Sequence, residues 1–228
     1  MGINKVEIID DKVRLRHVLI SVSDKSDLET FVPGLLEMNP ELRIISTGGT
    51  YRRIAEIIGS GAATNLIRVS DYTGQPETQG GLVKTLDFKI YLGLLTETYN
   101  KDHQADMERT GAVPIDMVVV NLYPFQDTVA RADVTPEMAR GNIDIGGPCM
   151  IRAAAKNFIR VASVVDPADY PLVLDSLKAN RGATDFGLRY RLARKAFAHT
   201  AAYDRAIAEY LKDQPFDQVE ACYRFQSA

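Results

Sequence analysis

Tryptophan is absent from this chain of 228 residues, and cysteine and histidine are rare. The two cysteines, Cys149 and Cys222, lie far apart in the sequence and give no disulfide framework of the kind found in small secreted domains. The three histidines, His17, His103 and His199, form no cluster with cysteine at the spacing of a zinc or iron site. We therefore expect a cytoplasmic protein that binds no metal.

Long apolar runs are also missing. No stretch reaches the length of a membrane span or follows a basic leader. Charged residues make up 25% and hydrophobic residues 46% of the sequence, with a formal net charge of -3. These values are ordinary for a globular protein and give no general attraction to nucleic acid or anionic lipid. We expect neither as a partner, so any binding of phosphate must rest on a local group of residues.

Short apolar segments alternate with segments of helical periodicity along most of the chain. The predicted strands cover residues 18–22, 42–46, 116–120 and 161–165, and the predicted helices cover 25–38, 50–58, 135–140 and most of 170–211. Strands that alternate with helices favour a parallel sheet with helices on both faces. The sequence therefore predicts a three-layer α/β fold with a mostly parallel, doubly wound sheet and a C-terminal helical extension.

Two polar loops follow the first two predicted strands. They read Ser21-Val-Ser-Asp-Lys25 and Ser46-Thr-Gly-Gly-Thr50. Both bring hydroxyl and backbone N–H groups to the start of a helix at one edge of the sheet, an arrangement that binds phosphate. In the alternative interpretation, Ser23, Asp24 and Thr50 only cap helices and the glycines only turn the chain. Walker and dinucleotide-binding patterns are absent, so nucleoside triphosphates and NAD are not expected as ligands.

Three further segments contain groups that serve in acid and base catalysis. A predicted buried strand ends in Asn121 and Tyr123, residues 142–147 read Asn-Ile-Asp-Ile-Gly-Gly, and residues 152–157 read Arg-Ala-Ala-Ala-Lys-Asn. Two lysines, Lys84 and Lys156, are either ordinary surface charges or, if desolvated near other cations, groups that titrate near neutral pH. The residues alone leave both interpretations open.

Six motifs in a fixed order carry a resemblance to a known family. They are Ser-Val-Ser-Asp-Lys, Ser-Thr-Gly-Gly-Thr, Gly-Gly-x-Val-Lys-Thr-Leu, Asn-Leu-Tyr-Pro-Phe, Ile-Asp-Ile-Gly-Gly and Arg-Ala-Ala-Ala-Lys-Asn, followed by Lys195-Ala-Phe-Ala-His-Thr-Ala-Ala-Tyr-Asp204. In this order they resemble the IMP cyclohydrolase domain of the bifunctional purine biosynthesis enzyme AICAR transformylase/IMP cyclohydrolase, which has a methylglyoxal-synthase-like fold. The resemblance covers residues 15–211 and leaves an N-terminal extension (1–14) and a C-terminal tail (212–228). It implies that the transformylase domain is absent from this chain.

The resemblance implies an enzyme that closes the six-membered ring of inosine monophosphate (IMP). In 5-formamidoimidazole-4-carboxamide ribotide (FAICAR), the carboxamide nitrogen attacks the formyl carbon and water leaves, with no cofactor. Lys156 would donate and accept the proton, and Lys84 would lie near the formyl oxygen. Tyr123 would donate a hydrogen bond to the developing charge, and Asp144 would orient the carboxamide. The residues implied to contact the substrate are Ser23, Asp24, Lys25, Ser46, Thr47, Gly48, Gly49, Thr50, Thr85, Asn121 and Ile145.

Implied partners follow from the same resemblance. They are the purine ribotide as a small-molecule substrate, a second copy of the chain in a homodimer, and a separate transformylase as a candidate supplier of the formylated substrate. The apolar helical content after Tyr170 is consistent with covering either the sheet or a second subunit. Periodicity does not distinguish these two roles.

One stretch departs from the family pattern, which usually has an arginine after two glycines and then a histidine and a proline. The residues that differ are Leu82, Asp87, Phe88 and Tyr91. A guanidinium group binds phosphate at two points and leucine cannot, so we expect ligand affinity or pose at this end to differ unless a nearby cation, Arg52 or Arg53, compensates. Because the four proposed chemical groups remain, we expect ring closure to be retained.

Two alternatives stay open at this point. A sensor that binds a purine ribotide without turnover would explain the departures at Leu82, Asp87 and Tyr91. A methylglyoxal-synthase-like lyase, which would eliminate phosphate from a small sugar phosphate, would use the same Ser-Thr-Gly-Gly-Thr loop. The motifs around Tyr123 and Lys156 favour the cyclohydrolase over the lyase.

Overall fold

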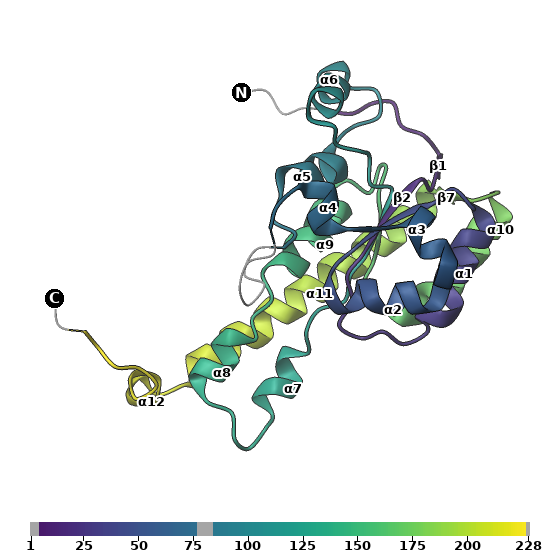
Figure 1. Ribbon diagram of the computed structural model, residues 1–228. Coiled ribbons are helices and arrows are strands. Elements are labelled where there is room, and N and C mark those ends of the chain that lie inside the picture. Colours follow the sequence, from purple (N-terminus) through teal and green to yellow (C-terminus); the bar gives the residue numbers. More distant parts are fainter. Residues whose placement is uncertain (1–4, 77–83, 227–228) are drawn as a thin grey trace.

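The computed structural model describes residues 5–76 and 84–226. A five-stranded parallel sheet lies at its centre, with the strand order β4-β3-β2-β5-β6 (Figure 1). Its strands are β2 (His17–Ile20), β3 (Arg43–Ser46), β4 (Leu66–Arg68), β5 (Met117–Val119) and β6 (Ala162–Val164). A separate antiparallel pair joins β1 (Lys12–Arg14) to β7 (Ala183–Asp185).

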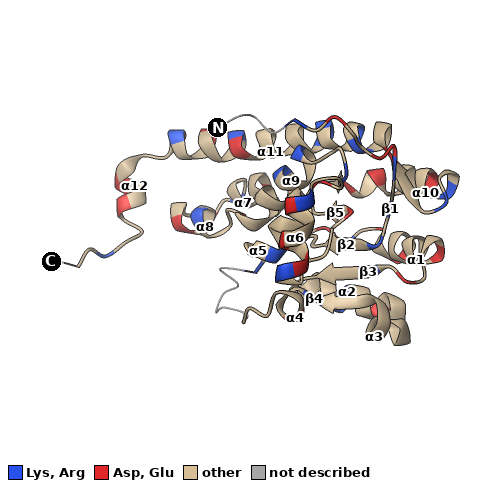
Figure 2. Cartoon of the chain, turned by 90° about the horizontal axis from the view of Figure 1, so that it is seen from above, with Lys and Arg blue, Asp and Glu red and all other residues tan. Residues whose placement is uncertain are grey.

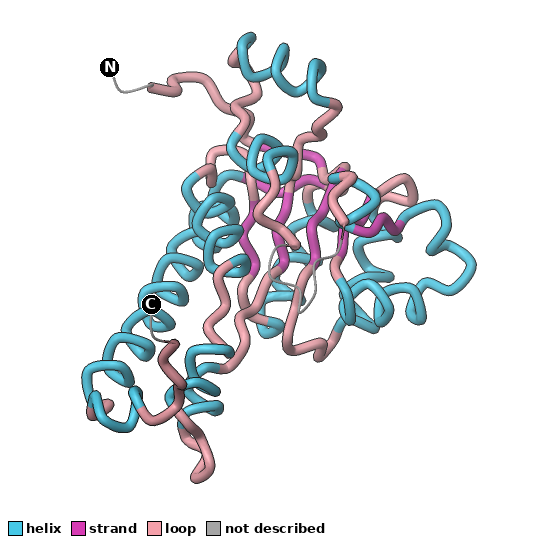
Figure 3. The backbone as a smooth tube through the Cα atoms, turned by 60° about the vertical axis from the view of Figure 1, so that its left-hand side comes forward, coloured by secondary structure: helices cyan, strands magenta, loops and turns pink. Residues whose placement is uncertain are grey.

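Helices cover both faces of the sheet (Figure 3). They are α1 (Leu28–Met38), α2 (Gly48–Ile58), α3 (Ala62–Asn65), α4 (Val69–Thr73), α5 (Phe88–Leu95), α6 (Lys101–Thr110), α7 (Phe125–Val129), α8 (Pro136–Gly141), α9 (Gly146–Lys156), α10 (Tyr170–Ala179), α11 (Phe186–Asp213) and α12 (Phe216–Glu220), with 3-10 turns at Gly59–Gly61 and Pro167–Asp169. Within the described ranges, no helix is both long and apolar enough to cross a membrane.

The two faces of the sheet form two separate hydrophobic cores. On β2, Val18 and Ile20 pack with α1, α2 and α10, whereas Leu19 between them packs with α5 and α9 on the other face. Ile44 and Ile45 on β3 divide in the same way. This alternation follows from the period of two in a β-strand, and both faces are apolar because helices cover both. The predicted three-layer α/β fold is confirmed.

The strands predicted at 18–22, 42–46, 116–120 and 161–165 are all present, each with shorter bounds. The edge strand β4 and the small β1–β7 sheet were not predicted. Each of these strands has only three residues, and β4 and β7 run directly into helices. Three residues are too few to establish a periodic pattern, so their pairing depends on contacts distant in the sequence.

The helix α11 has 28 residues and packs into both cores. Leu188 and Leu192 join the α1 side, whereas Ala193, Ala196 and Tyr203 join the α9 side. Seen from above, α11 runs beside the sheet and extends past it toward α8 and α12 (Figure 2). The helix therefore continues beyond residue 211, where the sequence predicted the start of a tail.

The amino-terminal edge of the sheet contains a buried ion pair. Asp116, which is fully buried, accepts hydrogen bonds from the backbone N–H groups of Arg16 (2.8 Å) and His17 (3.1 Å). Its other oxygen lies 3.1 Å from Nη1 of Arg160, whose remaining donors bind the carbonyl groups of Gly93, Thr96 and Ile115. Burial lowers the pKa of the Arg160 guanidinium to about 10, and Asp116 opposes that shift. The pair links β2, β5 and the start of β6.

A second buried arginine holds the chain near its amino terminus. Arg189 on α11 is fully buried and donates only to backbone carbonyl groups. Its acceptors are Asp10, Asp11, Phe158, Ile159 and Thr184. The predicted N-terminal extension is thus bound to α11 from residue 10 onward, and β1 completes the attachment by pairing with β7.

We predict that Asp116→Asn lowers the free energy of unfolding by about 3–5 kcal/mol, because it leaves the buried Arg160 charge without its counter-charge. Asp106→Asn is the matched control, since Asp106 pairs with Arg109 on the exposed surface of α6 and should cost less than about 1 kcal/mol. Urea denaturation of the parent and both variants measures the difference. Equal losses in the two variants would contradict the prediction.

Candidate functional site

The order of the strands creates a crevice at the carboxyl-terminal edge of the sheet. From β2 the chain moves outward through β3 to β4, and it then returns to the other side of β2 to form β5. The loops that follow β2 and β5 therefore leave the sheet toward opposite faces. Such a switch point is where open α/β sheets bind ligands.

A cavity of about 580 Å³ occupies this position. Its wall contains every predicted site residue except Asp24, Ser46 and Lys156: it includes Ser23, Lys25, Thr47, Gly48, Gly49, Thr50, Lys84, Thr85, Asn121, Tyr123, Asp144 and Ile145. Residues from five separate segments thus meet at one place. The volume is in the range of small-molecule sites.

One end of the cavity is built around the amino terminus of α2. The helix begins at Gly48, and the side chain of its N-cap residue, Thr47, makes no capping hydrogen bond. A Cβ atom added at Gly48 would lie 3.9 Å from Nζ of Lys84, and one added at Gly49 would lie 3.9 Å from Cε of Lys25. Both lysines therefore lie at the positive end of the helix dipole, a suitable position for an anion.

The hydroxyl groups of this loop have structural partners. Thr50 donates to the carbonyl of Val22 (3.0 Å) and accepts from its N–H group (3.1 Å). Ser46, which is fully buried, donates to the carbonyl of Ile20 at 2.7 Å. Thr50 and Ser46 thus hold this loop to the segment 20–22, and Thr50 also lines the cavity.

Asn121 joins the two loops that meet at the switch point. Its Oδ1 atom accepts from the N–H groups of Ser23 (2.7 Å) and Asp24 (2.9 Å), and its Nδ2 donates to the carbonyl of Asp24. Asp24 itself accepts from the backbone and hydroxyl of Ser26, which lower the pKa of its carboxyl group. Asn121 therefore fixes the shape of the loop that presents Ser23 and Lys25 to the cavity.

The opposite end of the cavity is built around the amino terminus of α9. Asp144 precedes this helix, and its Oδ1 accepts from the N–H group of Gly147 at 2.9 Å. The N–H group of Asp144 donates to the hydroxyl of Tyr203 on α11 at 2.8 Å. Burial raises the pKa of the Asp144 carboxyl group, and hydrogen bonds from Gly146 and Gly147 partly oppose this shift. Tyr123 and Ile145 are exposed at the same end.

Lys156 is not brought to the cavity. It is the last residue of α9, whereas Gly146, Gly147 and Met150 of that helix line the cavity. Lys156 follows Gly146 by ten positions and Met150 by six, which correspond to about 15 Å and about 9 Å along the helix axis. The side chain is exposed, and the neighbouring Asn157 donates to the carbonyls of Leu94 and Thr96. Within one subunit, Lys156 therefore lies at the amino-terminal edge of the sheet.

The residues that depart from the family pattern have different positions. Asp87 caps α5 by accepting from the N–H group of Lys89, and Phe88 is exposed. Tyr91 has a buried hydroxyl, and burial, together with the neighbouring Cys149, raises its pKa. Leu82 lies outside the described residues.

The two arginines expected to compensate for Leu82 do not line the cavity. Arg53 is paired with Glu29 and Glu56 on the outer side of α2. Sequence reasoning also missed Tyr203, although it lies in the motif 195–204, because no pattern showed that its hydroxyl reaches Asp144. No group of three or more metal-ligating side chains occurs in residues 5–76 and 84–226.

Comparisons with known proteins agree with this geometry. The family model described as "MGS-like domain" matches residues 27–149, and the model described as "AICARFT/IMPCHase bienzyme" matches residues 154–227. A relative described as "Bifunctional purine biosynthesis protein PurH" from Magnetococcus marinus is 50% identical over 198 residues, which are 87% of this chain and 36% of the relative. The protein of the same name from Chlorobium phaeobacteroides is 51% identical over 197 residues, 86% of this chain and 36% of the relative.

Among solved structures, "Crystal structure of ForH" aligns with a TM-score of 0.71 and 34% sequence identity, covering 86% of this chain and 98% of that one. The chain spans a little over a third of the length of the curated relatives that it matches. The MGS-like match extends over more than half of the chain, from α1 to the first turn of α9. The chain therefore belongs to the family of proteins with an MGS-like domain, and it is related to the purine biosynthesis proteins named PurH.

Proposed function

We propose that this protein is an IMP cyclohydrolase, which converts FAICAR to IMP and water. The observation that carries the proposal is a single cavity with two unlike ends. A helix amino terminus with Lys25 forms one end, Asp144 lies at the other, and Tyr123 lines the same cavity. The segment Lys84–Thr85 connects the two ends, because Lys84 lies near Gly48 of α2 and Thr85 lies near Gly146 of α9. The first end suits the ribose phosphate of a ribotide, and the second suits the groups that form the new ring. The relatedness to PurH and the bienzyme family match support the same reaction.

The reaction requires positioning and proton transfer but no change in oxidation state. A bond forms between the carboxamide nitrogen and the formyl carbon, and the bond between that carbon and its oxygen breaks. The oxygen leaves as water with one proton from the carboxamide nitrogen and one from the formamido nitrogen. Because both reacting groups belong to one molecule, a cavity that holds them in a reactive conformer removes much of the barrier. This scheme uses no cofactor.

The cavity residues divide naturally between these tasks. The half-buried carboxylate of Asp144 holds the carboxamide, and its raised pKa makes it a better proton acceptor than an exposed aspartate. Tyr123 and the ammonium group of Lys84 stabilise the negative charge that develops on the formyl oxygen. The first turn of α2 and Lys25 hold the phosphate.

The position of Lys156 limits its role. The resemblance assigns proton transfer to this residue, but Lys156 lies at the far end of α9 and does not line the cavity of the same subunit. Lys156 enters the scheme only if another copy of the chain carries it to the cavity. The variant Lys156→Met distinguishes proton transfer by Lys156 of a second copy from proton transfer by the cavity residues. Loss of turnover in a folded variant would support the first arrangement. Retained turnover would support the second.

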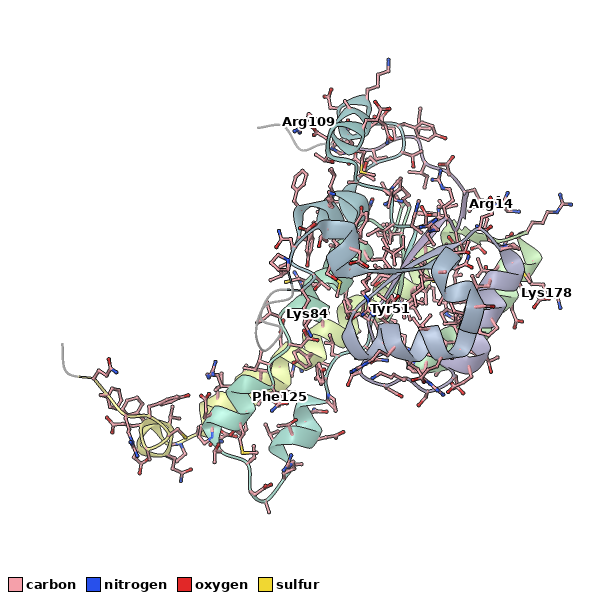
Figure 4. The ribbon with its side chains drawn as sticks, viewed as in Figure 1. Arg14, Tyr51, Lys84, Arg109, Phe125 and Lys178 are labelled. Atoms are coloured by element: carbon pink, nitrogen blue, oxygen red, sulfur yellow. The ribbon has the colours of Figure 1, made fainter. Side chains whose placement is uncertain are left out.

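We predict that the purified protein converts FAICAR to IMP without added metal or folate, and that Lys84→Met lowers kcat by about 10²- to 10³-fold through the loss of charge stabilisation. Lys178→Met is the matched control, because Lys178 is exposed on α10 (Figure 4). The measurement is the absorbance change on ring closure. A parent chain that binds FAICAR without turnover would instead be a sensor, and a parent chain that does neither would refute the proposal.

Gly147, which lies next to the carboxylate of Asp144, provides a test of whether the position of that carboxylate matters for the reaction. A Cβ atom added at Gly147 would lie 2.4 Å from Oδ2 of Asp144 and 2.7 Å from Leu122, so Gly147→Ala must displace the carboxylate. We predict a fall in kcat of at least about tenfold for a carboxylate displaced by about 1 Å. Gly141→Ala is the control, because Gly141 lines the same cavity and its Cβ would enter open space. Similar kcat values for both variants would show that the position of Asp144 does not limit the reaction.

A further inference from the structure

A narrow crevice of about 20 Å³ adjoins the large cavity at the end of β4. Thr47, Gly48 and Lys84 line both spaces, so the crevice opens at the amino terminus of α2. Its far wall is formed by Arg68, the last residue of β4, and by Ser70. A volume of this size holds about one water molecule, and thus a single oxygen atom of a larger ligand seated in the main cavity.

Arg68 is held at this crevice by an aromatic ring. Its guanidinium carbon lies 4.0 Å from the ring centroid of Tyr51, which belongs to the first turns of α2. In the parallel pairing of β3 with β4, Arg68 lies opposite Ser46, so the Cα atom of Arg68 is fixed at the carboxyl-terminal edge of the sheet. A guanidinium stacked on a ring keeps its N–H groups available around its edge.

Around the first turn of α2, the charged side chains that line the two spaces are all cations. Lys25, Lys84 and Arg68 gather around the first turn of α2, where the helix dipole is also positive. Among the described residues, Arg68 on β4 makes no ion pair with a carboxylate, in contrast to Arg53 on α2, which pairs with Glu29 and Glu56. Cations that gather without a matching anion repel one another, and a ligand with about two negative charges relieves that repulsion.

We propose that Arg68 binds the phosphate group of the ribotide, with Tyr51 as the residue that positions it. This inference rests on the proposed function and identifies what distinguishes a phosphorylated ligand from its nucleoside. A phosphate monoester carries about −1.5 to −2 charges at pH 7, and a planar guanidinium can bind two of its oxygen atoms at once. One oxygen would occupy the crevice, and the others would face the first turn of α2 and Lys25.

The test compares the binding of IMP and of inosine, which lacks the phosphate, by calorimetry or by competition. Loss of a charge-assisted contact should weaken IMP binding by about 10- to 100-fold in Arg68→Met and leave inosine binding unchanged. Arg53→Met removes the same charge from α2 at a position that lines neither space and is the matched control, for which we expect less than about a threefold change. Circular dichroism confirms that each variant is folded.

The positioning role of Tyr51 has its own readout. Tyr51→Leu removes the ring and should reproduce part of the loss in IMP affinity, whereas Tyr51→Phe keeps the ring face and should recover most of it. Equal IMP affinity in Arg68→Met and the parent would overturn the proposal, and so would an equal loss for IMP and inosine. A parent chain that binds no IMP would refute the proposed function itself, which is a different outcome.

Discussion

Two buried arginines at the amino-terminal edge of the sheet hold together the elements on which the rest of the structure depends. The hydrogen bonds of Arg160 and Arg189 point inward: one goes to Asp116, and the others go to backbone carbonyl groups. Buried charges are tolerated only when such partners replace the lost water. The carbonyls belong to α5 and its C-cap, to the segments before β1, β5 and β6, and to β7, so the two arginines join these elements to one another.

At the carboxyl-terminal edge of the sheet, some polar groups hold the loops and others face the cavity. Ser46, Thr50 and Asn121 hold the backbone of the loops, while the first N–H groups of α2 and the lysines at its end face the cavity. The residues with structural roles thus alternate along the chain with the residues that face the ligand. A rigid loop is necessary here, because electrostatic stabilisation of a reacting group depends on donors that are already in position.

Much of the fold was predictable, because β2, β3, β5 and β6 are apolar segments separated by helical ones. The cavity wall was largely predictable as well, since loops after parallel strands share one edge. Two features were not predictable from the sequence. The distance of Lys156 from the cavity depends on where α9 begins, and that start, at Gly146, separates Asp144 from Lys156 by the full length of the helix. Arg68 is the last residue of β4, a strand too short to be recognised in the sequence. Its contact with Tyr51 joins two segments that no local sequence pattern connects.

The hydrogen bond between Asp144 and Tyr203 has a consequence for the dynamics of the site. Tyr203 belongs to α11, which packs into both cores, so its hydroxyl cannot withdraw without disturbing a large part of the molecule. The amide hydrogen of Asp144 should therefore exchange with solvent deuterium on the slow timescale of near-global opening, although Ile145, the next residue, is exposed. The most rigid point of the cavity lies beside one of its most accessible residues.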